Sequence, residues 1–399
     1  MKNVVVVHHH EIVLKRDNRR YFEQFLMRNT RAALSGMTGA GAVRGGYGRF
    51  VIDVDSGAFV NPIVQRLRCV FGLANICAGV QVEQEIEVLC DTAEKLLEGC
   101  EFKTIRVHTN RSDKRFPLGS MAVNAKVGER LCRKFGVRAN LSEPDETVYI
   151  EIVDNVAFVY RSKTKGAGGL PTGVSGRVVS LLSAGFDSPV ASWRMMKRGA
   201  TVIFVHFHSI PYTSNNALDQ VRQLVGVLTR YQFHSKLYVI PFADIQQEIV
   251  LQAPEALRIL LYRRMMLRVA EAIASQEQAE ALVTGEAVGQ VASQTLRNIR
   301  IIDGVATLPV LRPISGNDKE ETMALAREIG TYEISSEPYD DCCSFLAPRR
   351  PQTWATEKEI ADAEARLDIS RLVEMALAKT TFEASQFPEI QQTQPVPLC

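Results

Sequence analysis

The turn Ser183-Ala-Gly-Phe-Asp-Ser188 contains the residue types and spacing best suited to chemistry in this chain of 399 residues. An apolar run from Arg177 to Leu182 predicts a buried strand before the turn, and the pattern at 188–199 predicts an amphipathic helix after it. Unpaired amides at a helix start, together with the positive end of the helix dipole, attract anions such as phosphate. The turn lacks Gly-Lys-Ser/Thr, which excludes the common nucleotide-triphosphate loop. Taken alone, the turn also fits an ordinary strand–turn–helix of an α/β domain.

Strands and helices alternate around this turn. We expect strands at 177–183, 201–208, 236–241 and 281–285, and helices at 188–199, 216–231 and 255–276. Such alternation predicts a parallel sheet with helices on both faces. Ligands of these sheets bind beyond the carboxyl ends of the strands, where we expect Ser183, His206 and Thr284 to emerge.

The first part of the chain has a different pattern. It predicts a small ferredoxin-like α+β unit, with a strand at 3–15, a helix at 19–34, a glycine-rich turn at 36–48, a strand at 49–53 and a helix at 62–69. A second unit begins near Val80, with helices at 84–97 and 120–135 and strands at 102–107, 147–153 and 157–160. A Gly/Lys/Pro-rich linker covers 163–174. The predicted domains are therefore 1–75, 76–170 and 175–399.

Composition and charge are those of a globular protein. The apolar stretches are shorter than the roughly 20 residues of a membrane helix, no signal-peptide pattern precedes Val4, and the eight cysteines include no CxxC pair. We therefore expect a cytoplasmic protein with reduced thiols. Residues 1–170 hold 25 Lys/Arg and 19 Asp/Glu, a net of +6, and the remainder has a net of −4. A basic first part joined to an acidic second part fits an RNA-binding module attached to a catalytic one, although a solvated surface also explains it.

Several motifs in register resemble one family over nearly the whole chain. They are His10–Lys15 with Asn18-Arg19, Phe116–Met121, the Ser183–Ser188 turn, Val205–Ser209, Leu261–Met266, Leu282–Glu286, Gly289–Thr295, Asp318–Thr322 and Tyr339–Cys343. In this order and spacing they resemble the ThiI sulfurtransferases, which are tRNA 4-thiouridine synthetases. The turn is similar to the PP-loop of ATP pyrophosphatases, and 102–152 is similar to a THUMP domain of tRNA-modifying enzymes.

The resemblance implies a reaction and its site residues. The enzyme would use ATP and Mg²⁺ to adenylate the C4 oxygen of uridine 8 in tRNA and would then replace that oxygen with sulfur. The implied nucleotide-binding residues are Leu181, Leu182, Ser183, Gly185, Ser188, His206, Phe207, Arg263, Gly285 and Gln294. The implied RNA-binding residues are Arg106, Arg111, Lys114 and Arg115. Asp187 would assist magnesium or orientation, although it could instead cap the helix that follows.

The pair Cys342-Cys343 occupies the family's sulfur-handling position, and we expect Cys342 to be the reactive thiol, with Cys343 as a further catalytic candidate. Such a thiol could carry a persulfide, attack the adenylated carbon or resolve a persulfide through a disulfide. A buried structural pair and an iron–sulfur cluster are the two alternatives.

Two features depart from the family pattern. Ala184 stands where the family has glycine, and it would weaken phosphate binding if the position required a positive φ. The chain also has no room for the rhodanese domain of longer members, so we expect the short form. The alternatives are another PP-loop enzyme, such as an amide-forming ligase, and a tRNA-binding protein with an impaired loop. The resemblance to the family also implies a homodimer, and a cysteine desulfurase or other sulfur donor as a partner; a role in thiamine synthesis stays open.

Overall fold

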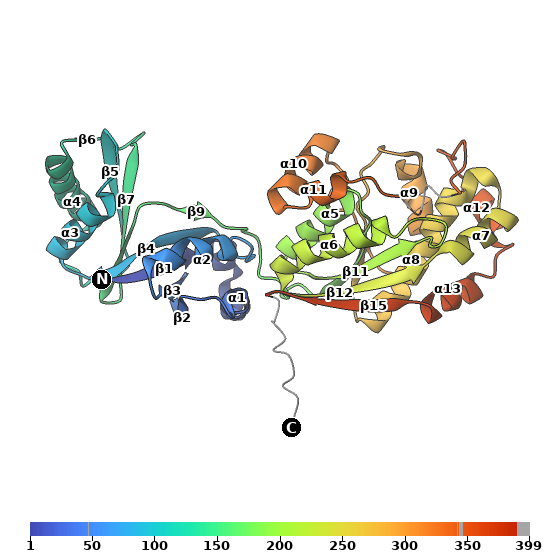
Figure 1. Cartoon of the computed structure of the whole chain (residues 1–399), viewed down its shortest axis with the longest axis horizontal. Coiled ribbons are helices and arrows are strands. Elements are labelled where there is room, and N and C mark those ends of the chain that lie inside the picture. Colours follow the sequence, from blue (N-terminus) through green and yellow to red (C-terminus); the bar gives the residue numbers. More distant parts are fainter. Residues whose placement is uncertain (47, 341, 343–345, 389–399) are drawn as a thin grey trace, which may run out of the picture. The chain divides into compact units, whose positions relative to one another are not determined.

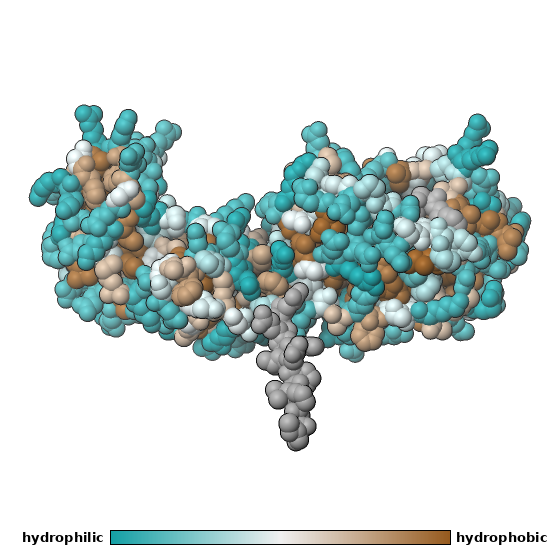
Figure 2. All heavy atoms as spheres, viewed as in Figure 1, coloured by the Kyte–Doolittle hydropathy of each residue, from teal (hydrophilic) through white to brown (hydrophobic). Residues whose placement is uncertain are grey.

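The computed structural model of the chain describes residues 1–46, 48–340, 342 and 346–388. These residues form two compact units, one of which is Met1–Leu170 and the other begins at Pro171 (Figure 1). Hydrophilic side chains dominate the face drawn in Figure 2, with hydrophobic ones scattered among them. None of the helices within the described ranges has the length and apolar character needed to cross a lipid bilayer.

The first unit is built on one sheet with the strand order β2-β3-β1-β4-β8-β7-β5-β6, and β9 pairs with β4. Its strands are β1 Lys2–His8, β2 Ala40–Gly46, β3 Arg49–Val54, β4 Asn75–Glu83, β5 Thr104–Arg111, β6 Arg138–Ala139, β7 Glu146–Val153, β8 Val156–Tyr160 and β9 Thr164–Lys165. Its α-helices are α1 Arg19–Leu34, α2 Val60–Leu67, α3 Ile86–Leu97 and α4 Ser120–Phe135, with short 3₁₀ turns at Glu11–Asn18 and Gly57–Phe59. The run Val4–Val7 is buried because β1 lies inside the sheet, between β3 and β4.

Two predicted elements of this unit are wrong. The strand expected at 3–15 ends at His8, and Glu11–Asn18 forms 3₁₀ helix with Arg16 at φ 43°. The glycine-rich turn expected at 36–48 contains β2, which pairs antiparallel with β3. Glycine has little intrinsic strand preference, so this strand is formed by pairing with β3 and not by its own residues.

A buried carboxylate joins strands from both halves of the first unit. Glu151 on β7 accepts a hydrogen bond from the Tyr160 hydroxyl on β8 at 2.5 Å, and its Oε1 lies 2.8 Å from Nε2 of His8 on β1. Arg49 on β3 lies 3.2 Å from the other oxygen. Burial alone would raise the pKa of Glu151, but these partners outweigh it and lower that pKa to about 2. One sheet and one ion cluster therefore hold 1–170 together.

The second unit is an α/β domain with the strand order β14-β13-β10-β11-β12-β15, parallel except for the antiparallel edge strand β15. Its strands are β10 Arg177–Leu181, β11 Thr201–His208, β12 His234–Pro241, β13 Ala281–Val283, β14 Val310–Leu311 and β15 Thr381–Gln386. Its α-helices are α5 Asp187–Lys197, α6 Asn216–Gln232, α7 Ala243–Gln252, α8 Arg258–Gln276, α9 Leu296–Asp303, α10 Lys319–Ile329, α11 Tyr332–Ser336, α12 Glu357–Glu364 and α13 Ile369–Ala378, with 3₁₀ turns at Glu255–Leu257 and Ala292–Gln294. The predicted parallel sheet is confirmed.

Helices cover both faces of this sheet, as expected from the alternating elements. Val179 and Val205 point into a core shared with α7, α8, α12 and α13. Ser180, the next residue of β10, points the opposite way, and its hydroxyl lies 2.8 Å from that of Ser192 on α5. This arrangement leaves the carboxyl ends of β10, β11 and β13 as the place where loops can build a site.

Candidate functional site

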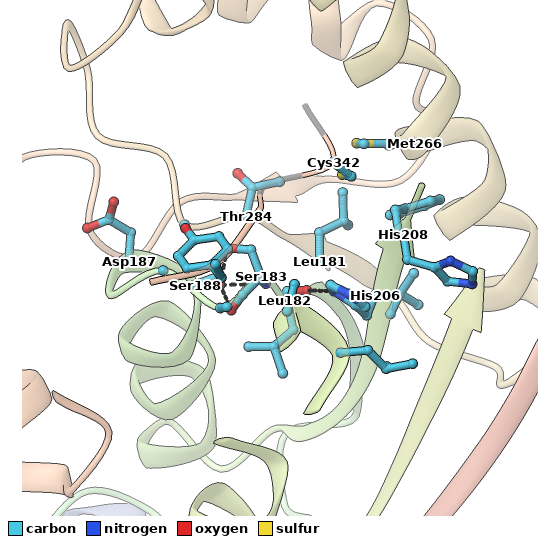
Figure 3. A pocket seen from close by; sticks show the side chains of 18 of the residues that line it. Leu181, Leu182, Ser183, Asp187, Ser188, His206, His208, Met266, Thr284 and Cys342 are labelled. Carbon is cyan, nitrogen blue, oxygen red and sulfur yellow. Dashed lines mark hydrogen bonds between the residues drawn. The ribbon is translucent and has the colours of Figure 1, made fainter. Parts of the chain in front are cut away.

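The turn between β10 and α5 is closed by its own serines. The backbone N–H of Ser183 donates to Oγ of Ser188 at 2.9 Å, and the Ser188 hydroxyl lies 3.2 Å from the Ser183 carbonyl oxygen, to which it donates (Figure 3). Ser188 therefore fixes the shape of the turn. Because α5 starts at Asp187, the turn lies at the amino end of this helix, where amides and the dipole favour anions.

Close backbone packing brings the segment that follows β13 against this turn. A Cβ placed on Gly285 would lie 2.5 Å from the amide nitrogen of Ser188 and 2.7 Å from the carbonyl carbon of Asp187. Only glycine allows this approach. Ala184 is buried and is not among the residues with positive φ, so the strain foreseen for an alanine there does not arise.

A cavity opens above this turn, and it brings together residues that are far apart in the sequence (Figure 3). All ten residues implied for the nucleotide line it: Leu181, Leu182, Ser183, Gly185, Ser188, His206, Phe207, Arg263, Gly285 and Gln294. Asp187 and Cys342 line the same cavity, whereas Cys343 lies outside the described residues. Ser183 and Thr284 follow their strands as expected, whereas His206 lies within β11 and reaches the cavity with its side chain.

Two buried hydrogen-bond acceptors point to a ligand in this cavity. Nδ1 of His206 lies 2.9 Å from the Leu182 carbonyl oxygen, so it carries the proton and donates. Burial lowers the pKa of His206 to about 4, which keeps the ring neutral and leaves Nε2 as an acceptor. Nε2 of His206 and Oε1 of Gln294 are both buried and have no hydrogen-bond partner among the described residues. Two such acceptors match a ligand that carries amino or hydroxyl donors.

Arg263 is held at the cavity by a carboxylate that sequence reasoning missed. Nη1 of Arg263 lies 3.0 Å from Oε1 of Glu286, and Nε of Arg312 lies 2.8 Å from Oε2. The Thr284 hydroxyl donates to the same Oε2 at 3.0 Å. Burial alone would raise the pKa of Glu286, but the charges of Arg263 and Arg312 outweigh it and lower that pKa. Glu286 ends the motif Leu282–Glu286, which was the available indication of its importance.

Asp187 has two side-chain partners, Lys319 and Gln290, and neither was identified as a site residue from the sequence. Nζ of Lys319 lies 3.3 Å from Oδ1 of Asp187, and Nε2 of Gln290 donates to Oδ2 at 3.1 Å. Lys319 begins α10, whose start is fixed by a capping box between Asp318 and Glu321. Lys319 lies within the motif Asp318–Thr322, which resembles the family pattern, but the sequence did not indicate that Lys319 pairs with Asp187. The structure thus places a cation beside the Ser183–Ser188 turn.

Cys342 is anchored to the cavity wall through its backbone. Nε2 of Gln246 on α7 donates to the Cys342 carbonyl oxygen at 2.7 Å. Oε1 of the same side chain accepts a hydrogen bond from the Ser209 hydroxyl. Figure 3 shows the Cys342 side chain near Met266. Among the described residues, no three His, Cys, Asp or Glu side chains are grouped so that they could hold a metal ion. Within that part of the chain the iron–sulfur alternative gains no support.

The four basic residues implied for RNA belong to the first unit. Arg106 donates to the Leu141 carbonyl oxygen at 3.1 Å and Arg111 to that of Phe116 at 2.8 Å, so both hold loops in place. Lys114 and Arg115 are exposed. Arg115 pairs with Asp113 at 2.9 Å, and its hydrogen bond holds the pKa of that carboxyl well below its usual range.

Comparisons with known proteins agree over nearly the whole chain. Residues 4–77 match the ThiI ferredoxin-like domain, 83–161 the THUMP domain, and 173–369 the family described as thiamine biosynthesis protein (ThiI). A relative from Brevibacillus brevis, named "Probable tRNA sulfurtransferase", is 40% identical over 96% of both chains. One from Thermus thermophilus with the same name is 39% identical over 92% of this chain and 90% of its own.

A solved structure described as a 4-thiouridine synthetase–RNA complex with bound ATP superimposes with a TM-score of 0.89 at 34% identity. The match covers 97% of this chain and 100% of that one. The chain therefore belongs to the ThiI family of tRNA sulfurtransferases.

Proposed function

We propose that this protein is an ATP-dependent tRNA sulfurtransferase that converts uridine 8 of tRNA to 4-thiouridine. One observation carries the proposal: a single cavity is lined by the Ser183–Ser188 turn, by buried unpaired acceptors and by the Cys342 thiol. A phosphate-binding turn suits the activation of an oxygen by adenylation, and a thiol in the same cavity suits its replacement by sulfur. The solved relative, described as a 4-thiouridine synthetase in complex with RNA and ATP, supports the use of ATP and RNA.

Each wall of the cavity has a role in binding ATP. The amides of the Ser183–Ser188 turn hold phosphate oxygens, and Arg263 adds a guanidinium. The adenine amino group or a ribose hydroxyl donates to Nε2 of His206 and Oε1 of Gln294, which are otherwise unpaired acceptors. Asp187, which lines the cavity, would hold Mg²⁺ together with phosphate oxygens and water.

The chemistry then follows in two displacements. The uracil O4 attacks the α-phosphorus of ATP, so an O–P bond forms and the bond to pyrophosphate breaks. A sulfur carried as a persulfide on Cys342 attacks C4, and AMP leaves with the original oxygen. A second thiol, for which Cys343 is the candidate, forms a disulfide with Cys342 and releases the thiocarbonyl.

Three partners complete the proposal. The first unit binds the RNA, with the exposed Lys114 and Arg115 contacting phosphates and Arg106 and Arg111 holding the loops that present them. A cysteine desulfurase supplies the sulfur. Two copies of the chain form a homodimer, for which light scattering coupled to size-exclusion chromatography is the direct measurement.

The test is thiouridine formation on unmodified tRNA, given ATP, Mg²⁺ and either a cysteine desulfurase or free sulfide. We expect the wild type to be active with both donors, and Cys342→Ser to be inactive with the desulfurase and active with sulfide. Asp187→Asn should stop pyrophosphate release with either donor, whereas Cys342→Ser should not. The absence of thiouridine from the wild type with both donors contradicts the proposed function.

A further inference from the structure

One of the two tryptophans of this chain lies on its surface. Trp354 is 67% exposed, whereas Trp193 is 5% exposed. The guanidinium carbon of Arg297 lies 5.0 Å from the centroid of the Trp354 ring. Unstacked bases of nucleic acids bind to exposed aromatic rings by stacking, and arginine adds a cation–π contribution.

The backbone around Trp354 is held in place on both sides. Nε of Arg297 donates to the Ala355 carbonyl oxygen at 2.6 Å, and the Thr295 hydroxyl donates to that of Thr353 at 3.0 Å. The fully buried amide of Asn298 donates to the Gln352 carbonyl oxygen and accepts from the Ala355 N–H. A segment fixed by four such bonds presents its indole in one place, as a binding platform requires.

The anchors of Trp354 continue directly into the proposed ATP site. Gln294, which precedes Thr295, lines the cavity, and Gln290 on the same segment donates to Asp187 at 3.1 Å. Val291, between Gln290 and Gln294, is 51% exposed, and Leu296, which follows Thr295, is 70% exposed. The surface around Trp354 is therefore joined by a few residues to the turn that we assign to the phosphates.

The charges near Trp354 favour a polyanion. Arg297 touches the ring, and Arg349 and Arg350 are exposed on the segment that leads to it. Arg300 lies one helical turn after Arg297 and pairs with Glu357, with both side chains 74% exposed. An exposed pair of this kind is weak, so Arg300 can exchange its carboxylate for a phosphate at small cost.

We propose that Trp354 and Arg297 form a stacking platform for an unstacked base of the substrate RNA, beside the base that is modified. The inference rests on the proposed function and adds a contact made by the catalytic unit itself. A uracil can present O4 to the α-phosphorus of ATP only after leaving its stack, which leaves its neighbours without stacking partners. An indole with an adjacent guanidinium replaces that stacking without sequence preference.

The first test uses Trp354 as its own reporter. In full-length Trp193→Phe, all indole emission comes from Trp354. We expect unmodified tRNA to quench this emission on titration, because a base stacks on the exposed ring. Unchanged emission on tRNA binding, or quenching by the cysteine desulfurase in place of tRNA, overturns the platform.

The second test is kinetic. Trp354→Ala should raise KM for tRNA about tenfold, leave KM for ATP unchanged, and be rescued by Trp354→Phe. Phe382→Ala is the matched control, because Phe382 is an aromatic residue of the same unit that is 63% exposed on β15. An unchanged KM for tRNA in Trp354→Ala, with an active wild type, refutes the platform alone. A wild type that forms no thiouridine refutes the proposed function and the platform with it.

Discussion

Arg263 and Glu286 form an ion pair in the wall of the cavity, with Nη1 and Oε1 3.0 Å apart and Glu286 2% exposed. We predict that Glu286→Ala raises KM for ATP at least tenfold, because Arg263 loses the carboxylate that orients it. We also expect the free energy of unfolding to fall by about 3 kcal/mol, since Arg312 loses the same buried partner. Glu286→Gln should retain part of the ATP binding and part of the stability, because its amide oxygen still accepts hydrogen bonds.

The helix α8, which carries Arg263, also carries the two arginines of a matched control for Glu286. Glu364 holds Arg264 at 2.7 Å and Arg268 at 2.6 Å, so it forms a second arrangement of one carboxylate with two guanidiniums. None of these three residues lines the cavity. Glu364→Ala should therefore destabilise the fold and leave KM for ATP unchanged. Equal changes of KM in both variants would show that Glu286 acts through stability alone.

Lys319 is predicted to assist departure of the pyrophosphate. Its Nζ lies 3.3 Å from Oδ1 of Asp187 and so beside the Ser183–Ser188 turn, to which we assign the phosphates. We expect Lys319→Ala to lower kcat for tRNA-dependent pyrophosphate release about a hundredfold, because a cation aimed at the developing charge is lost. Lys379→Ala is the control, since Lys379 pairs with Asp244 at 2.6 Å on the surface. Full activity of Lys319→Ala would exclude this role.

Gly285 is predicted to be required by packing alone. A Cβ there would lie 2.5 Å from the Ser188 amide nitrogen, so Gly285→Ala must push the segment after β13 and the turn apart. We expect a loss of about 2 kcal/mol in the free energy of unfolding and a marked loss of ATP affinity, measured by denaturation and calorimetry. Gly316→Ala should change neither, because no described residue other than its chain neighbours lies within 4 Å of its added Cβ. Normal ATP binding by Gly285→Ala would contradict this account.

The turn and its flanking elements could be predicted because their cause is local. The apolar run before Ser183 and the amphipathic pattern after it require only neighbouring residues, and the structure places β10 and α5 there. The same holds for α1 and α4, found at Arg19–Leu34 and Ser120–Phe135 as expected. The concern over Ala184 was also local, and it failed because the backbone there needs no positive φ.

Features that depend on distant partners could not be predicted. The strand β2 is glycine-rich and exists because it pairs with β3. The helix α7 was missed altogether, although it supplies Gln246, which bonds to Cys342 from 96 residues away. The role of Glu286 likewise depends on Arg263 and Arg312, which approach it only in the folded sheet. Residue type indicates that a carboxylate or amide needs a partner, but only the fold identifies that partner.

His206 is predicted to make the fold sensitive to acid. Its pKa is about 4 in the folded state, against an ordinary value of 6.5, because burial penalises the charged ring. The neutral ring therefore contributes stability above pH 6.5, and this contribution is lost as the pH falls towards 4. Between pH 7 and 4 we expect the free energy of unfolding to fall by about 3 kcal/mol more in the wild type than in His206→Asn. The amide of the asparagine can still donate to the Leu182 carbonyl oxygen. Equal pH slopes of the unfolding free energy would contradict this prediction.

Gln246 is predicted to position the thiol and not the nucleotide. It is fully buried, donates to the Cys342 carbonyl oxygen at 2.7 Å and accepts from Ser209. Gln246→Leu keeps the volume but removes both bonds, so the backbone that carries Cys342 should shift. We expect thiouridine formation with the desulfurase to fall at least tenfold while pyrophosphate release continues, because only the second displacement needs the thiol.

The adjacent residue supplies the control for Gln246. Gln247 lies on the same helix but bonds to the Tyr212 hydroxyl, at an exposed position. Gln247→Leu should leave both steps intact, which separates the position of Cys342 from a general effect on α7. Free sulfide should restore thiouridine formation in Gln246→Leu, since it does not need the protein thiol. A residue that acts only on Cys342 leaves adenylation unchanged. If Gln246→Leu lost pyrophosphate release together with thiouridine formation, Gln246 would instead support the whole cavity.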